Sequence, residues 1–255
     1  KLHIPVAHVE AGLRSFDKRM PEEINSVLTD HVSTYLFCPS QVSVDNLAAE
    51  GIKPSATPHP PDSSPLPPHV YTVGDVMYDL LLHAVQIARG KSRILDQLGI
   101  ESKRYHLLTI HRAENTDDTA RLDTMIGFVN EKASGLPVIF PMHPRMQKVY
   151  GEAGKRFSDN VRIIEPLGYF DLLTALENAQ CLMTDSGGMQ KEAYWLKVPC
   201  ITLRDQTEWV ETVESGWNIL WQDYQNAHHP HGETNAYGDG HAAQRIIQRL
   251  VIGHR

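Results

Sequence analysis

The sequence predicts an α/β fold built on parallel sheets, and three observations lead to this prediction. Short apolar runs suited to buried strands alternate along the chain with longer stretches of helical spacing. The runs are apolar throughout, which is typical of parallel strands covered on both faces. Polar residues follow one strand after another, and the carboxyl ends of parallel strands share one edge, where ligands bind. We therefore expect these polar residues to meet in one cleft.

Residues 181–192 form the segment around which the other elements are arranged. Residues 181–184 suit a buried strand, Asp-Ser-Gly-Gly suits a tight turn, and residues 189–197 have helical spacing. Glycines there would allow backbone conformations that a Cβ forbids and would leave the first helical N–H groups open to a phosphate. Glycine can also serve only to turn the chain. Glu192 favours a nucleotide as the ligand. A carboxylate near a phosphate is electrostatically unfavourable unless it faces another group, and the hydroxyls of a ribose are an obvious candidate.

The first part of the chain begins with a strand over residues 4–9, which ends at Glu10. A helix follows from Pro21 to about His31, with a proline in its first turn and acids where the helix dipole favours them. The next predicted elements are a strand over residues 35–38, a helix over 41–50 and a strand over 70–73.

A proline-rich stretch, residues 54–68, lies between these elements and holds seven prolines among its fifteen residues. It is typical of an irregular surface loop, either a tolerated insertion or a recognition motif for a partner. We place a domain boundary near Asp75.

In the second part of the chain, predicted strands alternate with stretches of helical spacing. Strands are predicted at 107–110, 137–140, 161–164, 181–184, 199–203 and 218–221, and helices at 76–88, 119–131, 169–178 and 240–251. The polar residues that follow strands are Glu10, His111, His143, Asp185 with Ser186, and Arg204.

Composition excludes some classes of function. The chain has 255 residues and a net charge of −7 without a basic tract, which argues against nucleic acid as the main partner. No apolar run is long enough to cross a bilayer, so we expect no membrane association. Cys38, Cys181 and Cys200 lie singly in apolar surroundings, which indicates buried thiols in a reducing compartment, the cytoplasm.

Taken together in chain order, the motifs resemble those of the non-hydrolysing UDP-N-acetylglucosamine 2-epimerases. The matching motifs are HVEAGLRS from His8, PEEIN from Pro21, HRAEN from His111, PMHP from Pro141, TDSGG from Thr184 with Glu192, RDQTEW from Arg204 and YGDG from Tyr237. Each motif is weak alone, and the ordered set covers nearly the whole chain.

The resemblance implies two Rossmann-like domains in the glycosyltransferase-B arrangement, with the substrate between them. Residues 1–75 would form the C-terminal half of an incomplete N-terminal domain, 76–239 the UDP-binding domain, and 240–255 a helix that packs back on the N-terminal domain. The family's first hundred or so residues, which carry a phosphate-contacting Arg and Lys and a catalytic Asp, have no counterpart here, so we expect the chain to be a fragment. Trp209 stands where some members have an arginine that touches the nucleotide.

The activity implied by the resemblance is the interconversion of UDP-N-acetylglucosamine and UDP-N-acetylmannosamine. UDP is eliminated to give a 2-acetamidoglucal and is then added back, with a proton delivered to the opposite face of C2. The resemblance implies no cofactor and no metal, and it implies a homodimer.

The resemblance implies functional roles for nine residues of this chain. Glu10 and Glu22 match its catalytic glutamates, and His111 matches a histidine that contacts the diphosphate and could stabilise the departing UDP. The positions matched to UDP-sugar binding are His143, Leu172 beside uracil, Ser186, Gly187 and Gly188 at the phosphate, and Glu192 at the ribose. Without the resemblance, Glu22 would be interpreted as a first-turn helix acid and His111 as a strand-end histidine bonded to backbone.

Two other readings of the chain stay open. A glycosyltransferase of the same architecture would also use a UDP-sugar, although Glu10 and Glu22 would then have no clear role. A truncated module could bind UDP without catalysis.

Two smaller groups of residues also allow alternatives. His228, His229 and His231 could hold a metal, but they lie in a polar loop without a supporting carboxylate pattern, which favours a solvated loop. Arg204 could simply pair with Asp205 or Glu208 at the surface.

Overall fold

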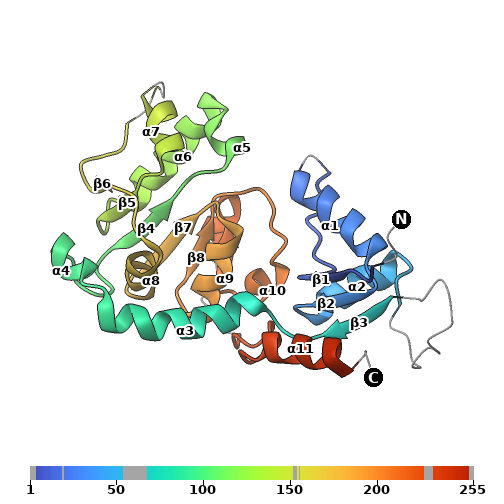
Figure 1. Cartoon of the computed structure of the whole chain (residues 1–255). Helices are drawn as coiled ribbons and strands as arrows, with labels where there is room; N and C mark the ends of the chain where they lie inside the picture. The colour runs from blue at the N-terminus through green and yellow to red at the C-terminus, as the bar shows by residue number, and fades with distance from the viewer. Residues whose placement is uncertain are drawn as a thin grey trace. The chain divides into compact units, whose positions relative to one another are not determined.

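The structure is a computed structural model of the chain and describes residues 4–18, 20–53, 68–151, 154, 156–226 and 232–252. It divides into two compact units, residues 1–82 with 235–255 (unit 1) and residues 83–234 (unit 2). Helix α3 (Val76–Lys91) contains the division (Figure 1). The proline-rich stretch is outside the described residues except for its last residue, Pro68.

Unit 1 has a three-stranded parallel sheet in the order β1-β2-β3. Its strands are β1 (Ala7–Val9), β2 (Tyr35–Cys38) and β3 (His69–Thr72), and its helices are α1 (Pro21–Val32), α2 (Gln41–Ala49) and α11 (Ala242–Ile252), with the start of α3. The two faces of β2 pack against different helices, because successive side chains of a strand point to opposite faces. Leu36 and Cys38 pack with Leu47 of α2, whereas Phe37 packs with Ile246 of α11.

The first turn of helix α11 is held by Asp79 of α3. The backbone N–H groups of Ala242 and Ala243 donate to the two carboxylate oxygens of Asp79, at 3.1 and 2.8 Å. These bonds satisfy donors that a helix start leaves without partners. Before α3, Gly74 takes a left-handed φ of 93°. A Cβ at this position would lie 3.0 Å from the carbonyl oxygen of Tyr237.

Unit 2 has a six-stranded sheet that is parallel throughout, in the order β6-β5-β4-β7-β8-β9. Its strands are β4 (His106–Thr109), β5 (Val138–Pro141), β6 (Val161–Ile164), β7 (Cys181–Thr184), β8 (Cys200–Thr202) and β9 (Asn218–Leu220). Its helices are the end of α3, α4 (Ile94–Leu98), α5 (Ala113–Thr116), α6 (Thr119–Lys132), α7 (Pro144–Tyr150), α8 (Tyr169–Glu177), α9 (Gly187–Trp195), α10 (Val210–Glu214) and the 3-10 helix η1 (Trp221–Asn226).

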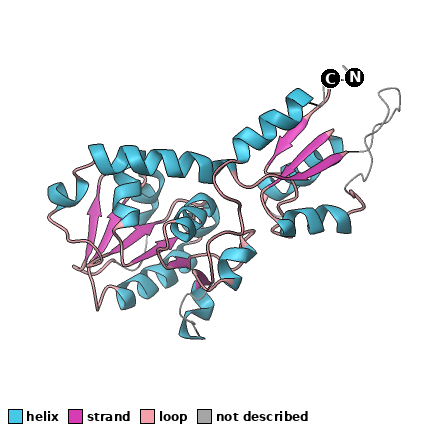
Figure 2. Cartoon of the chain, turned by 90° about the horizontal axis from the view of Figure 1, so that it is seen from below, coloured by secondary structure: helices cyan, strands magenta, loops and turns pink. Residues whose placement is uncertain are grey.

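Helices cover both faces of this sheet (Figure 2). On one face, Leu108 and Met183 pack with Met125 and Val129 of α6. On the other face, Leu107 and Leu182 pack in the cluster that contains α8 and α9. The near-continuous apolar strands predicted for a sheet buried on both sides are therefore explained by two separate cores, one on each face.

The predicted elements are present, and many of their ends differ from the predicted ones by one to three residues. The strand predicted over residues 4–9 begins only at Ala7. The helix predicted over residues 189–197 begins two residues earlier, at Gly187, because Ser186 caps it by accepting from the N–H of Met189. It ends at Trp195, since Lys197 takes a left-handed φ of 54°. No helix in the described part of the chain is both long and apolar enough to cross a membrane.

Candidate functional site

A pocket of about 380 Å³ opens at the carboxyl edge of the unit 2 sheet. The strand order places β4 beside β7 while the chain continues from β4 outward to β5 and from β7 outward to β8, so the direction of winding reverses between them. Such a reversal leaves a crevice at the strand ends, where ligands bind in open α/β sheets. The pocket is lined by Thr109, Ile110, His111, Pro141, His143, Pro166, Leu167, Tyr169, Leu172, Ser186, Gly188, Met189 and Glu192.

Six of the nine predicted site residues lie in this pocket. They are His111, His143, Leu172, Ser186, Gly188 and Glu192. Gly187 is buried beside them and does not line the pocket. Glu10 and Glu22 belong to unit 1.

The two glycines of the β7–α9 junction have different roles, and neither takes the positive φ for which sequence analysis invoked them. Both are ordinary residues of the first helical turn. A Cβ on Gly187 would lie 2.7 Å from Oε1 of Glu208 and 3.1 Å from Nε1 of Trp209, so a larger residue would require these side chains to shift. A Cβ on Gly188 would meet nothing within 4 Å, and this residue faces the pocket. The helix start is therefore open on the pocket side, where an anion could reach its N–H groups.

Glu192 is a buried carboxylate in the pocket wall. The hydroxyl of Tyr169 donates to its Oε1 at 2.9 Å. Burial raises the pKa of Glu192, while the hydrogen bond from Tyr169 and the charge of Lys191 oppose that rise. Sequence analysis did not include Tyr169 among the site residues. The available signal was an aromatic hydroxyl at the first turn of α8.

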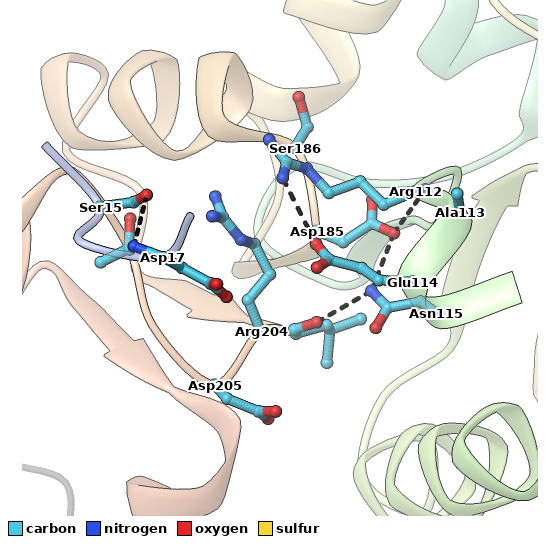
Figure 3. A network of polar contacts seen from close by, with 12 residues as sticks. Ser15, Asp17, Arg112, Ala113, Glu114, Asn115, Asp185, Ser186, Arg204 and Asp205 are labelled. Carbon is cyan, nitrogen blue, oxygen red and sulfur yellow. Dashed lines mark hydrogen bonds and ion pairs between the residues drawn. The ribbon is translucent and has the colours of Figure 1, made fainter. Parts of the chain in front are cut away.

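Asp185 is a second buried carboxylate that sequence analysis left out of the predicted site residues. It lies directly after β7 and accepts hydrogen bonds from the backbone N–H of Arg112 and from Nδ2 of Asn115 (Figure 3). It also accepts from the backbone N–H of His111. Nδ1 of His111 lies 3.1 Å from its Oδ1. Burial tends to raise the pKa of Asp185, but His111 and the other N–H donors outweigh it and hold this pKa below its usual value.

His111 and His143 face the same pocket from the ends of β4 and β5. Their ring centroids are 6.3 Å apart, and His111 keeps 43% of its side chain exposed. A histidine that is fixed on one nitrogen and accessible on the other can donate to or accept from a bound ligand.

Arg204 pairs with one of its two expected partners, but this pair is not at the surface as predicted. Nη1 of Arg204 lies 3.0 Å from Oε2 of Glu208, and both side chains are largely buried. Asp205 pairs instead with Arg121, at 2.8 Å. The Arg204–Glu208 pair fixes the carboxylate that lies against Gly187.

The two predicted glutamates of unit 1 have different surroundings. Glu10 follows β1 and has a left-handed φ of 67°, which is uncommon for a residue other than glycine. Such strain is found at functional positions more often than elsewhere. Glu22 is exposed in the first turn of α1. Its neighbour Glu23 is buried and accepts from the N–H and the hydroxyl of Ser15, at 2.7 and 2.9 Å.

The remaining candidates concern metals and cysteines. His228, His229 and His231 lie outside the described residues. Within the described ranges, no three His, Cys, Asp or Glu side chains are grouped so that they could hold a metal ion. Cys38, Cys181 and Cys200 are free thiols, and burial raises their pKa values.

A parallel sheet with an open helix start and a buried acid at its point of reversal defines the class of α/β proteins that bind nucleotides at the strand ends. Comparison with known proteins gives the family within this class. Residues 1–251 match the sequence model of the family described as UDP-N-acetylglucosamine 2-epimerase.

Individual relatives agree with this match. A UDP-N-acetylglucosamine 2-epimerase homolog of Methanococcus maripaludis is 46% identical over 98% of this chain and 70% of its own length. The UDP-2,3-diacetamido-2,3-dideoxy-D-glucuronate 2-epimerase of Pseudomonas aeruginosa is 42% identical over 98% of this chain and 69% of its own length. The crystal structure of Methanocaldococcus jannaschii UDP-GlcNAc 2-epimerase in complex with UDP-GlcNAc and UDP has a TM-score of 0.81 and 38% identity, covering 98% of this chain and 70% of that one.

The chain belongs to the UDP-N-acetylglucosamine 2-epimerase family. It spans about 70% of the length of these relatives, and its two parallel α/β sheets are of the same structural type. Relatives of similar identity act on different UDP-sugars, so the family defines a UDP-sugar 2-epimerase without fixing the sugar.

Proposed function

We propose that this protein interconverts UDP-N-acetylglucosamine and UDP-N-acetylmannosamine. A base takes the proton from C2, the C–H electron pair forms a C1=C2 double bond, and the C1–O bond breaks with its electron pair leaving on UDP. The intermediate is a 2-acetamidoglucal. UDP then adds back to C1 while a proton is delivered to the opposite face of C2.

The observation that carries this proposal is the pocket of unit 2. It combines an open helix start at Ser186 and Gly188 with the buried carboxylate of Glu192 and the imidazole of His111. The N–H groups at the start of the helix would hold the diphosphate, and Gly187 would contribute only its backbone N–H. Glu192 would accept from the ribose hydroxyls, and Leu172 would lie beside uracil. A related enzyme at 38% identity was solved in complex with UDP-GlcNAc and UDP, which supports this assignment.

We assign the chemical roles to three residues. Glu10 and Glu22 serve as the acid and base that move the C2 proton on the two faces of the sugar, and His111 stabilises the charge that develops on departing UDP. His143 contributes to binding of the UDP-sugar. The reaction needs no redox cofactor, because elimination and re-addition move only a proton and UDP and transfer no hydride.

The wider setting is also part of the proposal. We assign residues 1–75 and 76–239 to two Rossmann-like domains of the glycosyltransferase-B type, the first of them incomplete, and residues 240–255 to the closing helix. We expect a homodimer in the cytoplasm, and the three free thiols support a reducing compartment. Light scattering of the purified protein measures the oligomeric state.

A second sugar substrate has specific support. The Pseudomonas aeruginosa relative at 42% identity acts on UDP-2,3-diacetamido-2,3-dideoxy-D-glucuronate, which carries a second acetamido group and a carboxylate. The same elimination chemistry at C2 would apply to it, so the two candidates differ in the sugar groups and not in the mechanism.

One experiment separates these readings. The protein is incubated with each UDP-sugar, and the anomeric proton signals are followed by NMR. We expect UDP-N-acetylmannosamine to form from UDP-N-acetylglucosamine without release of free sugar. Turnover of only the diacetamido-glucuronate would assign the second substrate, and release of free N-acetylmannosamine would exclude the non-hydrolysing reaction. UDP binding without turnover of either would favour the binding module, and transfer to an added acceptor would favour the glycosyltransferase.

A further inference from the structure

We infer that Asp185 is the positioning residue of His111: it accepts from Nδ1 of the imidazole and so fixes the tautomer that presents Nε2 to the departing UDP. The inference rests on the proposed function only for the role of His111 in the reaction. The geometry that supports it lies entirely within unit 2.

The two oxygens of Asp185 share the backbone N–H of His111 and differ in their other partners. Oδ2 accepts from three N–H groups, those of His111 at 3.0 Å, of Arg112 at 2.9 Å and of the Asn115 side chain at 3.1 Å. Oδ1 accepts from the backbone N–H of His111 at 3.2 Å and lies 3.1 Å from its Nδ1. The carboxylate is fully buried, so water cannot replace any of these donors. Asp185 therefore holds both the backbone and the ring of His111.

The support around Asp185 is itself fixed. Asn115 donates its second side-chain hydrogen to the carbonyl of Leu203 at 3.1 Å, and its Oδ1 accepts from Nε of Arg121 at 2.7 Å. Arg121 in turn pairs with Asp205. The network joins the ends of β4, β7 and β8, which are neighbours in the sheet, and its central members are shown in Figure 3. Such outer contacts determine how precisely a functional side chain is placed.

The chemical consequence follows from hydrogen-bond roles. A carboxylate only accepts, so Nδ1 must carry a hydrogen when it bonds to Oδ1. In neutral His111 this leaves Nε2 as an acceptor, and in charged His111 both nitrogens donate. The charged form can donate from Nε2 to a phosphate oxygen as the C1–O bond breaks. The other titratable groups of the pocket wall are His143, Tyr169 and Glu192.

The tautomer can be measured directly by ¹⁵N NMR of the protein labelled at histidine, with His111→Gln used to identify the signals of His111. In the unaltered protein with a neutral ring, we expect hydrogen on Nδ1. In Asp185→Asn, the side-chain oxygen can still accept from the backbone N–H groups while the NH₂ group faces Nδ1. We therefore expect hydrogen to move to Nε2.

Asn115→Ala is the matched control, because it removes a donor to Oδ2 and leaves Oδ1 in place. We expect it to lower the melting temperature while the tautomer of His111 stays unchanged. A change of tautomer in both variants would contradict the inference, because the network would then act only through general packing. Hydrogen on Nε2 of His111 in the unaltered protein would also overturn it, even if Asp185→Asn did not fold.

The kinetic effect is a separate measurement. In Asp185→Asn we expect kcat to fall about 100- to 10,000-fold, as for loss of a charge-stabilising donor or of the carboxylate that positions a histidine. A protein without epimerase activity that still shows the expected tautomers would contradict the proposed function and leave the positioning role intact. Unchanged kcat with the altered tautomer would contradict the catalytic part of the inference.

Discussion

At the residue scale, Glu192 shows how a binding group can oppose stability. It is buried beside Tyr169 with its pKa raised, mainly because burial disfavours the charged form. Between the unfolded pKa and this raised value the folded protein holds the proton more tightly, so the stability falls as pH rises through that window. Above this window the loss is complete, and the ionised carboxylate is the form that would accept from ribose hydroxyls.

We therefore expect Glu192→Gln to stabilise the protein without ligand at pH 7.5 and to have less effect at pH 4. Affinity for UDP should fall about 10- to 100-fold, since a hydrogen bond to a charged group contributes about 1.5–3 kcal/mol. Thermal unfolding at the two pH values and titration calorimetry with UDP measure these effects. Equal changes in melting temperature at both pH values would show that ionisation of Glu192 has no part in stability.

The adjacent glycines provide a second prediction at this scale, with each variant serving as control for the other. Gly187→Ala should lower the melting temperature, because the new methyl group meets Oε1 of Glu208 and the ring of Trp209. Gly188→Ala should fold normally, because the space beside it is open, and should weaken UDP binding by obstructing the pocket. Loss of UDP affinity in a fully stable Gly187→Ala would contradict this division of roles.

At the element scale, the start of α1 places two glutamates side by side with different surroundings. Glu23 accepts two hydrogen bonds from Ser15 and thereby ties the loop after β1 to the helix, whereas Glu22 is exposed. The family resemblance assigns catalysis to Glu22 and to Glu10. Glu22 and Glu23 both lie in the first turn of α1, so this position alone does not distinguish them.

Glu23→Gln should lower the free energy of unfolding by about 1–3 kcal/mol, because the charged acceptor for Ser15 is lost. Glu22→Gln should change it by less than about 0.5 kcal/mol, as for most exposed substitutions, yet reduce kcat about 100- to 10,000-fold with little change in UDP affinity. Glu10→Gln should behave like Glu22→Gln in kinetics. Chemical denaturation, turnover and UDP titration separate the variants, and parallel losses of kcat and UDP affinity would mean that Glu10 and Glu22 only bind.

The elements themselves could largely be predicted from the sequence, because each strand of unit 2 is a short apolar run and each long helix has an apolar face. Sequence analysis missed short helices such as α4, α5 and α7, because helices of four to seven residues are too short to show a clear helical period of apolar residues. The role of Asp185 was also missed. Its partners, His111 and Asn115, are more than sixty residues away in sequence, and only the pairing of β4 with β7 brings them together.

At the scale of the whole molecule, the order of strands in unit 2 determines where chemistry can occur. Sequence analysis predicted that polar residues after the strands would meet, but not which strands are neighbours. The observed order puts the ends of β4, β5 and β7 together, and with them His111, His143 and Ser186. Arg204, at the end of β8, pairs with Glu208 behind Gly187 and does not line the pocket.

The central claim is that UDP binds at the carboxyl edge of unit 2, and a crystal structure of the protein with UDP tests it most directly. We predict the diphosphate at the N–H groups of Gly187 and Gly188, the ribose hydroxyls on Glu192, and Nε2 of His111 toward the phosphate. A well-ordered UDP bound elsewhere, with Glu192 and His111 free of contact to it, would contradict the account.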